Sequence, residues 1–113
     1  MNLPQATTSP VPQEVSTELQ RVVERWRQLP LDHARWYADR VHALVQSLAD
    51  RVAEAKGIAA SAVPDCGPAT LMDQLTVMVY DAGAATLMST AVTSTARIST
   101  LANDLASLRR ELV

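Results

Sequence analysis

The last quarter of the chain repeats an aliphatic side chain at alternating intervals of three and four residues. The repeating positions are Ile98, Leu101, Leu105, Leu108 and Leu112. This spacing is typical of an α-helix that packs along a second helix, because every member then falls on one helical face. We call these five residues the leucine seam. They predict a helical fold and a contact between helices, either within one chain or between two chains.

The rest of the composition agrees with a helical fold. Only three of the 113 residues are glycine, which argues against an all-β domain because such a domain needs many turns. A domain of 113 residues is large enough to bury a core without metals or disulfides, and the 48% of hydrophobic residues is ordinary for a folded protein. We therefore expect an all-α fold: an up-down four-helix bundle-like domain, or a helical protomer that completes a bundle by dimerising.

Prolines and glycines divide the chain into segments. Residues 1–12 hold three prolines among polar residues and predict a flexible tail before a single helical domain over 13–113. Pro30, Gly57 and Pro68 then separate the helical patterns, because proline and glycine interrupt helices. The expected helices span about 13–29, 32–56, 68–83 or 68–92, and 95–112.

The second predicted helix has the clearest start and stop signals. Asp32 is a suitable N-cap residue, which places Leu31 and Trp36 at the two positions of a hydrophobic staple. Gly57 is a suitable residue to end this helix. Because only a short elbow at Pro30 joins the first two helices, we expect them to be antiparallel neighbours.

The boundary between the third and fourth helices is ambiguous. The apolar stripe of the third helix and the leucine seam lie on different faces of any straight helix, so the chain must kink or turn between them. Two candidates are Gly83 and the β-branched, Ser-rich segment 93–100, near Thr95. Val77 and Tyr80 lie off the main stripe, which predicts a third helix that is apolar on two sides and central in the fold.

Two tryptophans flank the elbow and are candidate aromatic contacts for a partner. Exposed Trp26 and Trp36 would form a binding hot spot. The competing interpretation places Trp26 in the core and Trp36 in the staple with Leu31. The second interpretation is favoured by the spacing around Asp32.

Residues able to carry chemistry are few and scattered. His33 and His42 lie on opposite sides of the second helix and cannot share a metal ion. Cys66 is the only cysteine; its place before a helix leaves a reactive thiol as an alternative to a small turn residue. Asp73 and Asp81 do not form a catalytic pair in any evident cleft. The sequence therefore predicts no catalytic residues, no metal site and no cofactor.

Charge and hydropathy limit the classes of partner. The formal net charge is −2, with neither half strongly basic, so nucleic acid is not an expected partner. No stretch reaches the roughly 20 apolar residues of a membrane span, and the N-terminus lacks the pattern of a secretory signal. We expect a cytoplasmic protein. Arginine outnumbers lysine nine to one, which we attribute to a GC-rich coding sequence.

These features favour a non-enzymatic helical protein–protein interaction module, an adaptor or a small regulatory subunit that assembles through amphipathic helices. Its partner would be another protein or a second copy of the chain. One alternative is a regulator in a nucleic-acid-linked system, such as an antitoxin or a transcription cofactor. A second alternative is a small enzyme with a cleft in the bundle.

Overall fold

The computed structural model describes residues 11–86 and 91–112, with side chains for 11–86 and 95–112. These residues form four α-helices and no β-strand, which confirms the predicted all-α, four-helix bundle-like fold. The helices are α1 (Gln13–Gln28), α2 (Leu31–Lys56), α3 (Leu71–Thr86) and α4 (Ala91–Glu111). A short 3₁₀ helix, η2 (Pro68–Thr70), leads directly into α3.

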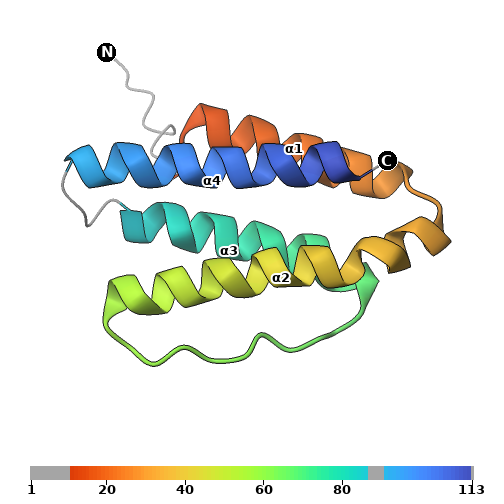
Figure 1. Ribbon diagram of the computed structural model, residues 1–113, viewed down its shortest axis with the longest axis horizontal. Helices are drawn as coiled ribbons and strands as arrows, with labels where there is room; N and C mark the ends of the chain where they lie inside the picture. The colour runs from red at the N-terminus through yellow and green to blue at the C-terminus, as the bar shows by residue number, and fades with distance from the viewer. Residues whose placement is uncertain (1–10, 87–90, 113) are drawn as a thin grey trace, which may run out of the picture.

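The four helices form two layers. α1 packs mainly on α4, and α2 packs mainly on α3 (Figure 1). Followed from the N-terminus, α1 and α4 run in one direction and α2 and α3 in the other (Figure 1). The expected up-down order is therefore wrong, because α2 and α3 are parallel neighbours. The elbow at Pro30 does reverse the chain, but α1 makes its main contacts with α4 rather than with α2.

A long connection makes the parallel pair possible. Residues 57–67 leave the end of α2 and return along the outside of that helix to the start of η2 (Figure 1). An extended chain of this length reaches about 35 Å, which exceeds the roughly 24 Å length of α3. The return segment therefore has enough length to bring the two helix starts to the same end of the bundle.

The described chain is packed from its first residue. Residues 1–10 of the predicted tail lie outside the described residues, but Val11 is buried in the core. Pro12 accepts hydrogen bonds from the amides of Val15 and Ser16 and so begins α1. The predicted tail of 1–12 is thus too long at its C-terminal end, because the apolar side chain of Val11 has a core to pack against.

α2 begins one residue earlier than expected, and this shift removes the predicted staple. The Ala34 amide donates to the Pro30 carbonyl at 2.9 Å, so Pro30 is the N-cap residue and no side chain caps the helix. Leu31 and Trp36 are then five residues apart within the helix, about 140° around its axis. They cannot contact as a staple, and both are exposed.

The other end of α2 agrees with the prediction. Gly57 is left-handed, with φ +71°, and its amide donates to the Glu54 carbonyl at 3.1 Å. The Ile58 amide donates to the Ala53 carbonyl at 3.0 Å. This pair of bonds is a Schellman motif, which satisfies carbonyls that the helix end would leave unpaired.

The chain does not break at Gly83 or within segment 93–100, the two positions predicted for the boundary between α3 and α4. α3 continues through Gly83 to Thr86, and α4 begins at Ala91 and continues through segment 93–100. Residues 87–90, between these two helices in the sequence, lie outside the described residues. Thr86 and Thr100 each donate a hydroxyl hydrogen bond to the carbonyl four residues earlier, so both side chains find a partner within the helix.

Candidate interaction surfaces

The leucine seam lies in the core of its own chain. Leu101, Leu105, Leu108 and Leu112 are buried, and Ile98 is half-buried against the same core. They pack with apolar residues from the other helices, mainly across the contact between α1 and α4. Intramolecular packing therefore accounts for the 3–4 spacing without a second chain.

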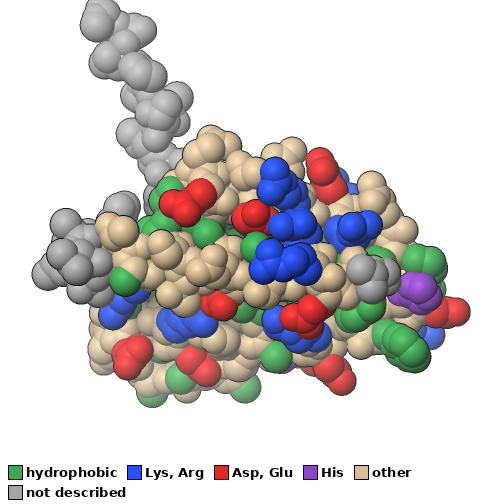
Figure 2. Space-filling model, turned by 45° about the horizontal axis from the view of Figure 1, so that its top comes forward, with side chains coloured by type: hydrophobic (Ala, Val, Ile, Leu, Met, Phe, Trp, Pro, Cys, Tyr) green, Lys and Arg blue, Asp and Glu red, His purple; other side chains and the backbone are tan. Residues whose placement is uncertain are grey.

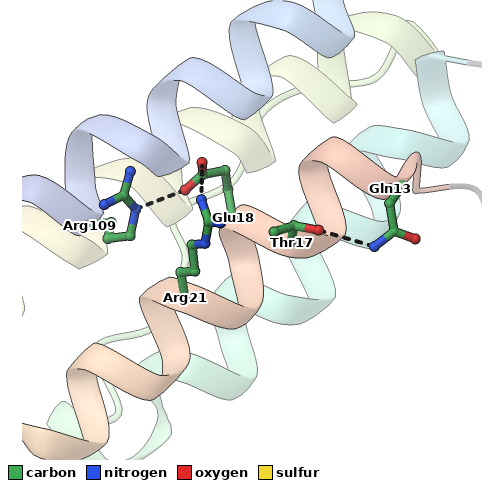
Figure 3. Close-up of polar contacts among 5 residues, drawn as sticks. All are labelled: Gln13, Thr17, Glu18, Arg21 and Arg109. Carbon is green, nitrogen blue, oxygen red and sulfur yellow. Dashed lines mark hydrogen bonds and ion pairs between the residues drawn. The ribbon is translucent and has the colours of Figure 1, made fainter.

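Ion pairs connect the polar edges of α4 to both layers. Arg109 Nε lies 2.9 Å from Glu18 Oε1 of α1, and Arg21 contacts the other oxygen of Glu18 (Figure 3). Toward α2, Glu111 accepts two hydrogen bonds from Arg40, at 2.9 and 3.0 Å. Partly exposed pairs of this kind each contribute roughly 0–1 kcal/mol, so they orient α4 more than they stabilise it.

A third pair joins the middle of α4 to α2. Arg51 Nη2 lies 2.9 Å from Asp104 Oδ2. The two ion pairs between α2 and α4 show that these helices are antiparallel. Arg40, earlier in α2, contacts Glu111, which is later in α4 than Asp104. The buried leucines of the seam are thus flanked by ion pairs to α1 and to α2, whereas Ile98, at the start of the seam, is only half-buried.

The two tryptophans have opposite environments. Trp26 is 9% exposed and belongs to the core, whereas Trp36 is 83% exposed near the start of α2. Leu31, at the first position of the same helix, is 63% exposed. We call Trp36 and Leu31 the Trp36 surface. Figure 2 shows hydrophobic side chains beside charged ones at the end of the molecule where α1 joins α2.

A second apolar surface lies between α2, α3 and the return segment 57–67. A groove of about 500 Å³ opens there, and the residues that line it are mostly apolar. Its rim carries Ile58, which is 62% exposed, and Val77, which is 54% exposed. Tyr80, one turn along α3 from Val77, is 42% exposed. We call this region the α3 groove.

Polar side chains of the two helices hold the return segment over the groove. Gln46 Nε2 donates to the Ser61 carbonyl at 3.0 Å, and Gln46 Oε1 accepts from the Val63 amide at 2.7 Å. His42 Nε2 donates to the Val63 carbonyl at 3.0 Å. From α3, Gln74 Nε2 donates to the Pro64 carbonyl at 3.0 Å. His42 therefore has a structural partner in the return segment.

The other candidates for chemistry do not converge. His33 is exposed on α2, and Cys66 is a free, exposed thiol in the turn before η2. Asp65 Oδ1 accepts from the Gly67 amide at 3.1 Å and shapes that turn. Within the described residues, no three His, Cys, Asp or Glu side chains lie together where they could hold a metal ion. None of the described helices is long and apolar enough to cross a membrane.

The α3 groove was not predicted, although part of its signal is present in the sequence. Val77 and Tyr80 were expected to make α3 apolar on two sides and central in the fold. The first expectation holds, but α3 buries only the side that carries Leu71, Leu75 and Val79. The expected central position is confirmed, because α3 contacts α1, α2 and α4, but no other described element covers Val77 and Tyr80.

Comparison with known proteins adds no assignment. No protein-family model matches the chain, and no curated protein or solved structure is similar to it. Function must therefore be argued from the surfaces of the molecule.

Proposed function

We propose that the chain is a non-enzymatic helical protein–protein interaction module, an adaptor or small regulatory subunit, that binds its partner through the Trp36 surface. The single observation that carries the proposal is the 83% exposure of Trp36. Its helix is fixed to the core by Ala34, Val41 and other buried residues, so the indole is presented on a rigid element. Rigidity lowers the entropy cost of binding.

Physical reasoning supports a protein as the partner. A tryptophan side chain buries roughly 150–250 Å² when covered, and tryptophan is enriched among the residues that dominate binding energy. Arg35 and Asp39 are exposed nearby in sequence and supply charges of both signs. An aromatic residue with charged neighbours resembles the centre and rim of a typical protein interface.

The charge distribution favours a protein partner over nucleic acid. Figure 2 shows several Lys and Arg side chains side by side near the middle of the face it presents, with Asp and Glu side chains next to and around them, and the net charge of the chain is −2. A nucleic-acid surface would instead carry a clear excess of positive charge. A cytoplasmic location is part of the proposal, supported by the presence of only one cysteine in the sequence.

The experiment compares capture of host proteins by the wild type, Trp36→Ala and Trp36→Phe. We expect the alanine variant to lose its partner, with affinity reduced by roughly 30-fold or more, as at a typical hot spot. The phenylalanine variant keeps an aromatic side chain and should retain most of the binding. Capture of the same proteins by all three variants, at equal strength, would refute a role for this surface.

A further inference from the structure

We propose that the α3 groove is covered by a second copy of this chain, with the two α3 helices packed antiparallel about a twofold axis. This dimer is independent of the Trp36 surface and leaves Trp36 available for a different protein. Three observations carry the proposal: the spacing of exposed residues on α3, the shape of the surface, and the position of its charges.

The exposed face of α3 has the spacing of a helix-packing face. Val77, Tyr80 and Ala84 are exposed and follow one another at intervals of three and four residues. This is the spacing that brings side chains onto one face toward a neighbouring helix. On the buried face of α3, Leu75 and Val79 already contact the core. α3 therefore has one face packed in its own chain and one apolar face without a partner among the described residues.

The surface combines a hollow with protruding apolar side chains. Small residues line much of the groove, including Ala49, Ala53, Ala59 and Ala62, and allow close approach. Ile58 and Val77 stand at its rim, and Tyr80 follows on the same face of α3. In a twofold dimer each copy contributes the same patch, so the patch must contain both protruding side chains and a hollow that accommodates those of the other copy. This surface provides both.

The charges of the groove are opposite in sign and lie at opposite ends. Lys56 is the last residue of α2, and Asp73 is in the first turn of α3. Since α2 and α3 are parallel and finish at the same end of the bundle, Lys56 and Asp73 are separated along the groove (Figure 1). No other charged residue lines it.

A twofold axis perpendicular to α3 reverses one copy relative to the other. It brings Lys56 of each chain to the end of the groove that holds Asp73 of the other chain, so two attractive pairs form. A strongly acidic or basic partner would match one of these charges and oppose the other. The charge pattern therefore favours a second copy over a charged peptide.

The first test is sedimentation of the wild type over about a hundredfold range of concentration, with melting measured at each concentration. We expect a monomer–dimer equilibrium and a melting temperature that rises with concentration. Val77→Glu should be monomeric where the wild type is dimeric, while retaining its helix content, because Val77 is exposed in the single chain. Ala43→Glu adds the same charge at an exposed position of α2 outside the groove and should leave the dimer intact.

The second test exchanges the charges. Lys56→Glu and Asp73→Lys should each weaken the dimer by about tenfold, because each creates two repulsive pairs in place of two attractive ones. The double variant should recover most of the wild-type affinity, which loss of helix stability alone cannot produce. A wild type that is monomeric throughout, a dimer that persists in Val77→Glu, or a double variant weaker than both single variants would each overturn the proposal.

The outcome is separable from that of the proposed function. Trp36→Ala should dimerise as the wild type does, and monomeric Val77→Glu should still capture the protein that binds the Trp36 surface. Wild-type monomers that bind an amphipathic helix or a small apolar molecule in the groove would contradict the dimer and leave the Trp36 surface untested by that result.

Discussion

At the scale of single residues, Gln46 links the return segment to α2. Its amide group uses one donor and one acceptor on two backbone groups, the Ser61 carbonyl and the Val63 amide. The Gln46 side chain thus supplies hydrogen-bond partners for backbone groups of the return segment, which has no helix or strand to supply them. The half-buried position of Val63 makes the acceptor the more important half of this arrangement.

Gln46→Ala should lower the free energy of unfolding by roughly 1–2 kcal/mol, because the Val63 amide loses its partner in a half-buried site. Urea denaturation measures the loss, and hydrogen exchange at the Val63 amide should accelerate. Gln46→Glu keeps an acceptor for the Val63 amide but loses the donors to the Ser61 carbonyl and to Asp50 Oδ1, so exchange at Val63 should stay slow even though overall stability falls. Unchanged exchange at Val63 in the alanine variant would show that the contact does not hold the segment.

At the scale of elements, the ends of α2 depend on backbone conformation. Gly57 adopts φ +71°, and nothing lies within 4 Å of a Cβ added there. Gly57→Ala should therefore cost about 1–2 kcal/mol through the left-handed conformation alone, without a steric clash. Gly57→Asn should cost less, because asparagine tolerates this conformation better. If the wild type and Gly57→Ala were equally stable in urea, α2 would not end at Gly57 in the left-handed conformation in solution.

Helix ends marked by Pro30 and Gly57 were predictable, because these residues act through their own backbone. The start of α2 was not, because Pro30 supplies the carbonyl that begins the helix and Asp32 is not needed as a cap. The junction of α3 and α4 was missed for a related reason. Propensity makes Gly83 and the threonines weak helix formers, but tertiary context outweighs propensity, and α3 and α4 continue through these residues.

At the scale of the whole molecule, the direction of α3 could not be read from the pattern. An apolar stripe identifies the buried face of a helix, but it is the same whichever way the helix runs. Residues 57–67 are long enough for either a turn or a full return. The return is determined by contacts such as those of Gln46 and Gln74, which form only in the folded chain.

The same limit applies to the candidate surfaces. The leucine seam was predictable as a helix contact, but its spacing does not distinguish a partner in the same chain from one in another chain. Trp36 was assigned to a staple because Asp32 was assigned to the cap, whereas Pro30, two residues earlier, is the N-cap and Trp36 is exposed. The α3 groove depends on the path of the return segment and therefore has no complete signature in the sequence.

The central claim is that the leucine seam is the core of a single chain and that binding residues lie outside it. Urea denaturation of Leu105→Ala and Trp36→Ala at several protein concentrations tests this most directly, because the loss caused by Leu105→Ala should be the same at each concentration if the seam is packed within one chain. Leu105 is fully buried, so its truncation should cost about 2–5 kcal/mol. Trp36→Ala should change stability by no more than about 0.5 kcal/mol, as is usual for an exposed site. A stable Leu105→Ala protein beside a strongly destabilised Trp36→Ala protein would contradict the claim.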